Sequence, residues 1–215
     1  RRASSLMDTP DFDGPNTDVK QDRDSADSKA ALRRRFRASR KQRERRQRQK
    51  DAAQLNQHLL GIESIGSSAW VAGYLAFDGE PDIRFTLTQL CRRGVGVALP
   101  IMPDSSDAGL QFQRWTPATP LVANHLGVSE PRTGELVALE EIDTLLLPLV
   151  AFDRLGNRLG MGAGWYDRTL SSPACRAARI GVAWSLQESK HLPVDDWDQP
   201  LDVVVTEKGW FTCSP

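Results

Sequence analysis

A continuous apolar run that leads directly into a glycine-rich loop is the feature that most restricts the fold of this chain. The run covers Leu145–Phe152, and glycines follow at positions 156, 160, 162 and 164. An apolar segment of this length without alternation predicts a strand that is buried on both faces, as in parallel sheets covered by helices. Ligands of such sheets bind beyond the carboxyl ends of the strands, which is where this loop begins.

Further apolar and amphipathic segments extend this pattern. We expect strands at Ala69–Phe77, Val95–Met102, Leu110–Trp115, Ile180–Trp184 and Leu201–Thr206, and helices at Asp82–Arg93 and from Trp165 to Leu170. Strands without alternation, separated by helical stretches, predict an α/β fold, in which a mainly parallel sheet forms the middle of a three-layer sandwich.

The N-terminal part is expected to contain a long helix. Ser28 is a suitable N-cap for a helix that runs from Lys29 to Leu60, with apolar pairs four residues apart near both ends. Its middle, residues 37–51, has little to bury and should be solvated. Residues 1–27 are rich in Asp, Ser, Pro and Gly, which is typical of disorder. We therefore expect a disordered segment at 1–27 and a single domain at 28–215.

The net charge of zero hides two segments of opposite sign. Residues 8–27 contain seven aspartates, and residues 33–50 contain eleven Lys or Arg against the single Glu44. The basic run allows a nucleic-acid-binding module as an alternative function. We favour a solvated helix face, because no aromatic side chain follows Phe36 in the run to stack on bases. No specific nucleic-acid partner is expected.

The cysteines, histidines and hydropathy exclude several classes of protein. Cys91, Cys175 and Cys213 are far apart and form no CxxC pair, so neither a disulfide framework nor a zinc site is indicated. The three histidines lack the spacing of paired metal ligands. No apolar run has the length of a membrane span. We expect a cytoplasmic monomer without membrane association.

The glycine-rich loop has the composition of an anion site. Glycines at alternate positions allow successive backbone N–H groups to point toward one centre, and a helix beginning near Trp165 would add its dipole. Arg158 and Arg168 offer positive charge, and Asp167 offers a ligand for a cation. The loop is neither a Walker A loop nor a dinucleotide fingerprint. On spacing alone, a nucleotide-phosphate site with a metal and a purely structural turn remain alternatives.

The whole segment resembles the signature of the 5-formyltetrahydrofolate cyclo-ligase (methenyltetrahydrofolate synthetase) family. The matching residues are Pro148, Phe152-Asp153, Gly156, Arg158-Leu159-Gly160, Gly162-Ala163-Gly164 and Trp165-Tyr166-Asp167-Arg168. The resemblance continues, in family order, over about residues 29–210. It includes Lys29-Ala30-Ala31-Leu32-Arg33, Tyr74-Leu75 with Glu80, Leu99-Pro100, Gly127-Val128-Ser129-Glu130-Pro131, Gln187, Leu192-Pro193, Asp198 and Val205-Thr206-Glu207.

This resemblance implies a Rossmann-like sheet and a ligase that uses ATP and Mg²⁺ to convert 5-formyltetrahydrofolate to 5,10-methenyltetrahydrofolate. It implies catalytic roles for Arg158 and Asp167, and metal binding by Asp167 and Asp198. The implied nucleotide site comprises Lys29, Arg33, Arg158, Gly160, Gly162, Gly164 and Tyr166. Lys29 and Arg33 are four residues apart, so they share one helix face.

The implied folate site comprises Leu75, Glu80, Met161 and Trp165, with the Glu80 carboxylate accepting from the pterin N–H groups. The alternative for Glu80 is an exposed acid in the turn that it shares with Asp78 and Gly79. Two positions depart from the family pattern. Trp165 replaces the usual tyrosine, and Ala163 stands where the family often has Gly or Lys. A relative that binds ATP but has lost turnover is therefore a further alternative.

Overall fold

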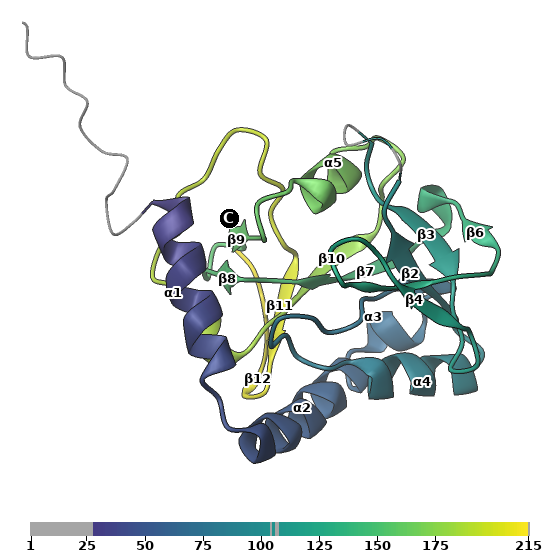
Figure 1. Cartoon of the computed structure of the whole chain (residues 1–215), viewed down its shortest axis with the longest axis horizontal. Helices are drawn as coiled ribbons and strands as arrows, with labels where there is room; N and C mark the ends of the chain where they lie inside the picture. Colours follow the sequence, from purple (N-terminus) through teal and green to yellow (C-terminus); the bar gives the residue numbers. More distant parts are fainter. Residues whose placement is uncertain (1–27, 104, 106–107, 215) are drawn as a thin grey trace, which may run out of the picture.

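The computed structural model describes residues 28–103, 105 and 108–214 as a layered α/β fold (Figure 1). Within these residues, eight strands form one sheet in the order β12-β11-β10-β7-β1-β2-β3-β6. Its strands are β1 (Trp70–Ala72), β2 (Gly96–Ile101), β3 (Gln111–Arg114), β6 (Leu136–Val137), β7 (Thr144–Pro148), β10 (Ala178–Val182), β11 (Val203–Thr206) and β12 (Gly209–Thr212). The five strands from β11 to β2 in this order are parallel to one another. β12 pairs antiparallel with β11, and β3 pairs antiparallel with β2. The predicted mainly parallel α/β sheet is confirmed.

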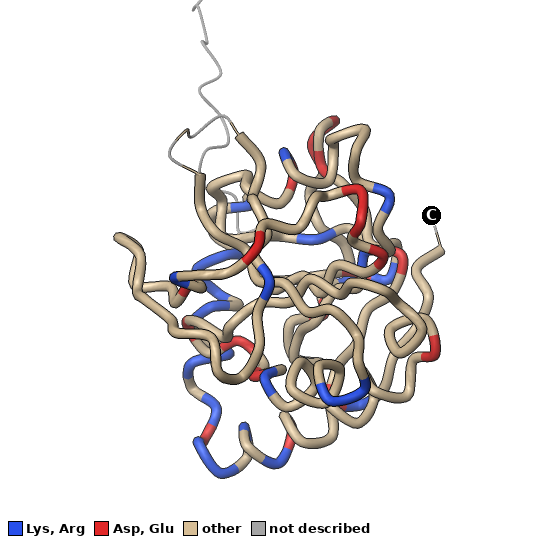
Figure 2. Tube along the Cα trace, turned by 90° about the vertical axis from the view of Figure 1, so that its right-hand side faces the viewer, with Lys and Arg blue, Asp and Glu red and all other residues tan. Residues whose placement is uncertain are grey.

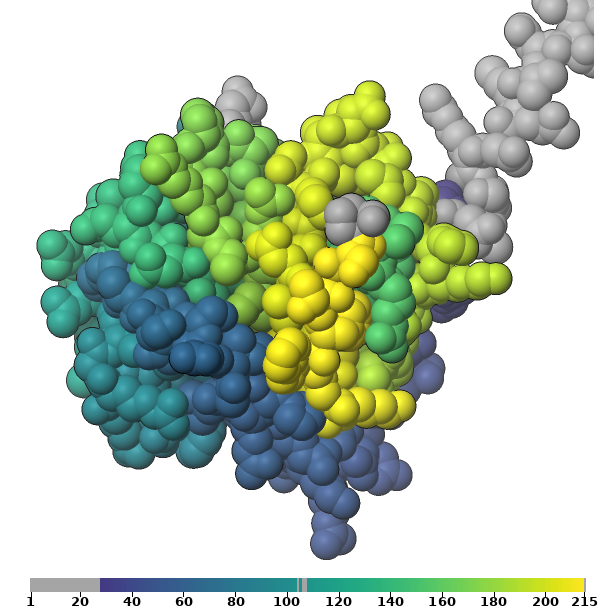
Figure 3. All heavy atoms as spheres, turned by 180° about the vertical axis from the view of Figure 1, so that it is seen from behind, coloured from purple at the N-terminus to yellow at the C-terminus, as the bar shows by residue number. Residues whose placement is uncertain are grey.

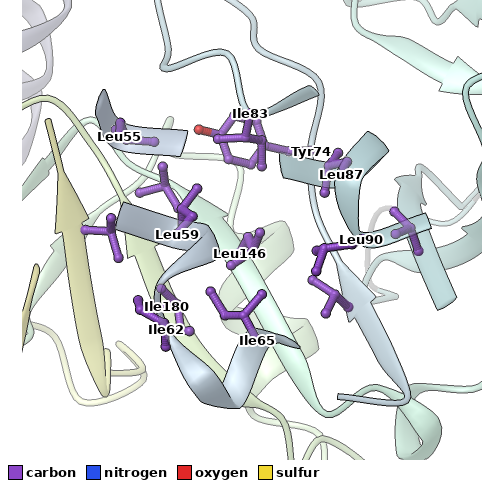
Figure 4. Close-up of a cluster of buried hydrophobic side chains, with 14 of the residues drawn as sticks. Leu55, Leu59, Ile62, Ile65, Tyr74, Ile83, Leu87, Leu90, Leu146 and Ile180 are labelled. Atoms are coloured by element: carbon purple, nitrogen blue, oxygen red, sulfur yellow. The ribbon is translucent and has the colours of Figure 1, made fainter. Parts of the chain in front are cut away.

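Two layers of apolar side chains pack on the two faces of the sheet. On one face lie α2 (Arg45–Leu60), α3 (Glu63–Gly66) and α4 (Arg84–Arg92). Leu55, Leu59 and Ile65 belong to a core cluster that also includes Leu146 and Ile180 of the sheet (Figure 4). Seen from behind, α2 lies against the C-terminal strands (Figure 3). These contacts bury nearly continuous apolar surface, which is the main stabilising contribution to such a fold.

The opposite face is covered by shorter elements. Leu170 and Tyr166 of α5 (Trp165–Leu170) and Leu139 of the 3-10 helix η1 (Leu139–Glu141) pack on a second cluster with Leu145 and Leu147 of β7. The remaining elements are the hairpin β4 (Leu121–Ala123) and β5 (Ser129–Pro131), the hairpin β8 (Ala151–Phe152) and β9 (Arg158–Leu159), and the 3-10 helix η2 (Ser185–Gln187). Both hairpins lie outside the main sheet.

The expected long N-terminal helix is wrong. Two helices, α1 (Lys29–Lys41) and α2, are separated at residues 42–44, although the N-cap Ser28, the start at Lys29 and the end at Leu60 are as expected. At the break Arg43 packs over the Trp184 ring, 4.5 Å from its centroid, and pairs with Asp51. Since α1 contacts β8 and η2 while α2 contacts α4 and β11, packing against different neighbours overrides helix propensity here.

The expected solvation of residues 37–51 holds for all but two residues of that segment, and the single strand expected at 145–152 is wrong. Arg40 is fully buried and Asp51 is 6% exposed. The apolar run divides into β7 and β8, because the chain leaves the main sheet after Pro148 and the Val150 N–H donates to the Leu159 carbonyl instead. The strand expected at 69–77 is shortened to β1. Within the described residues, no helix is long and apolar enough to cross a membrane. The expected disorder of residues 1–27 lies outside the described residues.

Candidate functional site

A pocket of about 480 Å³ opens beyond the carboxyl ends of β1, β2 and β7. Its wall is completed by α1, the glycine-rich loop, α5, the β4–β5 hairpin and the segment 195–198. All thirteen site residues expected from the sequence line it: Lys29, Arg33, Leu75, Glu80, Arg158, Gly160, Met161, Gly162, Gly164, Trp165, Tyr166, Asp167 and Asp198. The location agrees with the rule for ligands of parallel sheets.

The glycine-rich loop has an unusual backbone conformation and is hydrogen-bonded to α1. Gly162 and Gly164 have φ values of 106° and 72°, a region that other residues rarely adopt. A Cβ on Gly164 would lie 2.7 Å from the Arg168 guanidinium. The Arg33 Nε donates to the Gly160 carbonyl at 2.9 Å, which fixes the loop against the helix. The loop therefore presents backbone to the pocket at two positions whose conformation disfavours any residue but glycine.

One expected cation is not at the pocket wall. The Arg168 Nε donates to the Ala108 carbonyl at 3.1 Å, and its guanidinium lies over the Trp165 ring, 4.6 Å from the centroid. Arg168 thus supports Trp165 from behind and is absent from the pocket lining. Helix α5, whose dipole was expected to attract an anion, has six residues, so its dipole is that of a short helix.

Two ion-pair groups occupy the side of the pocket next to the loop. The Lys29 Nζ lies 2.7 Å from the Asp195 carboxylate and 2.5 Å from the Asp198 carboxylate, and the Arg158 Nη2 lies 2.5 Å from the Asp167 carboxylate. Burial lowers the pKa of Arg158, against the opposing effect of Asp167. Burial opposes ionisation of Asp198, but the Asp195 N–H and the Lys29 ammonium together hold its pKa below the ordinary value.

The other side of the pocket is largely apolar and contains the carboxylates of Glu80 and Glu130. Leu75, Pro100, Met102, Met161 and Trp165 contribute to the apolar wall. The Glu80 side chain is 8% exposed, so the alternative of an exposed turn acid is wrong. Its Oε2 accepts from the Phe77 N–H at 3.0 Å. Burial raises the pKa of Glu80 to about 7, against the effects of the Arg40 guanidinium and this hydrogen bond.

Sequence reasoning missed several residues of the site. Asp195 and Trp197 belong to the pocket wall, and Arg40 lies directly behind it, 3.8 Å from both the Glu80 carboxylate and the Met161 sulfur. A signal for Arg40 was present, because Leu32, Phe36 and Arg40 follow each other at intervals of four residues and all three are buried. An arginine that continues an apolar helix stripe indicates a buried partner.

The pocket carboxylates Asp167 and Asp198 suit a metal ion that binds together with a phosphate ligand better than one held by the protein alone. Among residues 28–103, 105 and 108–214, no cluster of three or more His, Cys, Asp or Glu side chains forms a metal site. Mg²⁺ commonly binds through one or two carboxylates together with substrate phosphates. Asp167 and Asp198 both face the pocket beside the glycine-rich loop and fit that pattern.

A family model and curated relatives relate this chain to the same enzyme family. The model of the 5-formyltetrahydrofolate cyclo-ligase family matches residues 25–207. The 5-formyltetrahydrofolate cyclo-ligase of Escherichia coli strain K12 is 38% identical over 168 residues, which cover 76% of this chain and 92% of that protein. The enzyme of the same name from Haemophilus influenzae is 37% identical over 155 residues, or 70% of this chain and 83% of that protein.

Solved structures agree. The NMR structure of the Aquifex aeolicus 5,10-methenyltetrahydrofolate synthetase has a TM-score of 0.76 and 32% identity, over 86% of this chain and 92% of that one. The Mycoplasma pneumoniae 5,10-methenyltetrahydrofolate synthetase has a TM-score of 0.69 at 22% identity, over 84% and 99%, which supports the fold alone.

Proposed function

Because the chain belongs to the 5-formyltetrahydrofolate cyclo-ligase family, we propose that it converts 5-formyltetrahydrofolate to 5,10-methenyltetrahydrofolate, with conversion of ATP to ADP and phosphate. The observation that carries this proposal is the division of one pocket into two chemical halves. One half joins a glycine-rich loop to cations, and the other places the enclosed Glu80 carboxylate in an apolar wall. The two halves suit a polyphosphate and a flat heterocycle, respectively.

The chemistry needs both ligands in one pocket. A formamide oxygen is a poor leaving group, and transfer of the ATP γ-phosphoryl group to it makes it a good one. Folate nitrogen 10 then attacks the formyl carbon and loses its proton, and phosphate leaves with the former formyl oxygen. Such transfers depend chiefly on positioning and on neutralising charge. A shared pocket of about 480 Å³ supplies the positioning.

The cations of the loop half are proposed to hold the phosphates. Lys29, Arg33 and Arg158 line the pocket, and the first and last of these pair with carboxylates in the described structure. An incoming polyphosphate competes for these cations and so releases Asp167 and Asp198. Mg²⁺, when bound with the nucleotide, neutralises phosphate charge, and Asp167 and Asp198 are its proposed ligands.

The folate half is proposed to orient the pterin. The Glu80 carboxylate accepts from two adjacent pterin N–H groups, which fixes the plane of the ring. Leu75, Met161 and Trp165 pack on its faces, while Tyr166, which also lines the pocket, stays assigned to the nucleotide. Trp165 thus keeps an aromatic side chain at the position where the family usually has tyrosine, which favours retained turnover over the alternative of an inactive relative.

Localisation and assembly are proposed on separate grounds. Among the described residues Cys91, Cys175 and Cys213 are free thiols, which fits a reducing compartment such as the cytoplasm. One chain supplies every residue of the proposed site, which fits a monomer. Nothing favours the nucleic-acid alternative, since Arg40 and Arg43 of the basic run are engaged in the protein interior.

An absorbance assay tests the function. Incubation with 5-formyltetrahydrofolate and Mg-ATP should produce the near-ultraviolet band of the methenyl product, and omission of ATP or of the divalent cation should abolish it. Asp167→Asn should lower the rate at least about a hundredfold, because loss of a charge that acts on the transition state typically costs a few kcal/mol. The exposed Asp196→Asn is the matched control and should keep the rate. Wild-type protein that forms no product would overturn the proposal.

A further inference from the structure

The Arg40 guanidinium is a buried charge that lies outside the pocket lining but contacts two of its residues. Its side chain is fully buried, on the face of α1 that also carries Leu32 and Phe36. Its Nη1 lies 3.8 Å from the Glu80 Oε1, and its Nη2 lies 3.8 Å from the Met161 sulfur. A buried charge of this kind is costly unless it is well paired, so its partners indicate its purpose.

The hydrogen bonds of Arg40 go to the turn before Glu80 and to the end of β7. Nε donates to the Asp78 carbonyl at 2.7 Å, Nη2 donates to the Asp78 carboxylate at 2.9 Å, and Nη1 donates to the Leu149 carbonyl at 3.1 Å. Asp78 has a φ of 52°, so the turn itself has an unusual backbone conformation. The guanidinium is therefore fixed in place, with Nη1 directed toward both Leu149 and Glu80.

Two of these partners do not depend on Arg40. The Leu149 carbonyl also accepts from the Gln187 Nε2 at 2.6 Å. The Asp78 carboxylate also pairs with Arg37 and Lys41 on the solvent side of α1. Glu80 is different, since Arg40 supplies its ion-pair contact in the described structure.

Apart from Arg40 and the Phe77 N–H, the groups near Glu80 favour its charge weakly or oppose it. Asp78 is a like charge, Arg37 acts only weakly from the surface, and Tyr74 and Tyr166 are buried phenols whose pKa values lie above their ordinary range because of burial. The Tyr74 hydroxyl donates to the Pro81 carbonyl at 2.9 Å and is thereby engaged. Among the described residues, removal of Arg40 would leave the Phe77 N–H and Arg37 as the groups that favour the charge of Glu80.

We propose that Arg40 is a positioning residue for folate, which keeps Glu80 ionised and oriented so that the carboxylate accepts from the pterin N–H groups. This role rests on the proposed function of Glu80. It also links the two halves of the pocket, because Arg33 on the same helix holds the glycine-rich loop. Asp78 weakens the effect of Arg40 on the Glu80 pKa, because both carboxylates contact the same guanidinium.

The test is the pH dependence of 5-formyltetrahydrofolate affinity, measured by calorimetry between pH 6 and 9. Arg40→Met should move the midpoint for loss of affinity upward by about one pH unit, because a cation within 4–6 Å shifts a carboxyl pKa by about that much or more. Affinity at pH 7 should then fall about fivefold and at pH 9 by less. Arg40→Lys, which keeps the charge, should restore part of the shift.

Two further variants make the result specific. Asp78→Asn should move the midpoint downward, because Glu80 is then the carboxylate that pairs with Arg40. Asn tolerates the positive φ at this position, so the turn should keep its conformation. Asp78→Asn also carries the test if Arg40→Met fails to fold. Arg34→Met removes an exposed cation on the same helix, which lies outside the pocket lining, and it should leave the midpoint unchanged.

The outcomes separate this inference from the proposed function. Opposite shifts in Arg40→Met and Asp78→Asn support the positioning role, which a purely structural arginine would not produce. Binding with the wild-type midpoint in the folded variants overturns that role and leaves the proposed function standing. A wild-type protein that binds no 5-formyltetrahydrofolate at any pH overturns the proposed function itself.

Discussion

At the scale of single residues, the side chain of Glu80 combines enclosure with a role that requires charge. Burial raises the pKa of its carboxyl to about 7 from an ordinary 4.5. The folded protein therefore binds this proton more tightly than the unfolded chain does. The contribution to the free energy of unfolding is complete below about pH 4.5 and is lost as the pH rises to about 7. Folate binding by the carboxylate has the opposite pH dependence, since it needs the ionised form.

Glu80→Gln should separate stability from binding. The amide remains neutral, so the variant should gain stability relative to wild type as the pH rises from 5 to 8, by an amount on the order of 3 kcal/mol. Affinity for 5-formyltetrahydrofolate at pH 8 should fall about tenfold. Urea unfolding at both pH values and calorimetry measure the two effects. Glu63→Gln, at an exposed position, is the control. A stability difference that does not change with pH would contradict the buried, titrating carboxyl.

The residues of the site were predictable to the extent that their chemistry is local. The glycines, Asp167 and Arg158 lie within one short segment whose composition indicates an anion and a cation site. The helix stripe indicates that Arg40 is buried but not its partner, because Asp78 lies 38 residues further along the chain. The same applies to Asp195, whose contact with Lys29 spans 166 residues.

At the scale of elements, α1 connects the cations of the site to the glycine-rich loop. Lys29 and Arg33 lie one turn apart, and both line the pocket. The prediction of one helix to Leu60 was wrong, because the sequence carries no Gly or Pro at 42–44 and the break is marked by the tertiary contacts of Arg43 with Trp184 and Asp51. Strand positions were predictable from apolar runs, whereas the division of β7 from β8 depends on hydrogen bonds to Gln187 and Leu159.

Substitutions on α1 should affect the nucleotide more than the folate. Lys29→Ala and Arg33→Ala should each raise the KM for ATP about tenfold, as expected for loss of a charge-assisted phosphate contact, and should raise the KM for 5-formyltetrahydrofolate by less. Steady-state kinetics with each substrate varied separately measure this. Arg34→Ala is the matched control, since Arg34 is exposed on the same helix and absent from the pocket lining. A larger effect on folate than on ATP would contradict the assignment of α1 to the phosphates.

At the scale of the whole molecule, the arrangement of the sheet determines where the pocket forms. The parallel strands bring Tyr74, Met102 and Pro148 to one edge, and segments distant in sequence close the pocket around them. In the traced chain, Lys and Arg positions gather along the lower edge of the view and both signs occur elsewhere (Figure 2), while the full sequence has 28 residues of each sign. The α/β class and the pocket edge followed from strand pattern alone, whereas the antiparallel β12 and the β4–β5 hairpin did not, because their pairing depends on partners that no local pattern shows.

The most direct measurement of the proposed mechanism follows the formyl oxygen. A substrate labelled with oxygen-18 at the formyl group is converted in the presence of Mg-ATP, and the released phosphate is analysed by mass spectrometry. Phosphoryl transfer to the formyl oxygen predicts one labelled oxygen in each phosphate formed, in step with the methenyl product and ADP. Formation of the methenyl product with unlabelled phosphate would contradict the mechanism, because the formyl oxygen would then leave by another route.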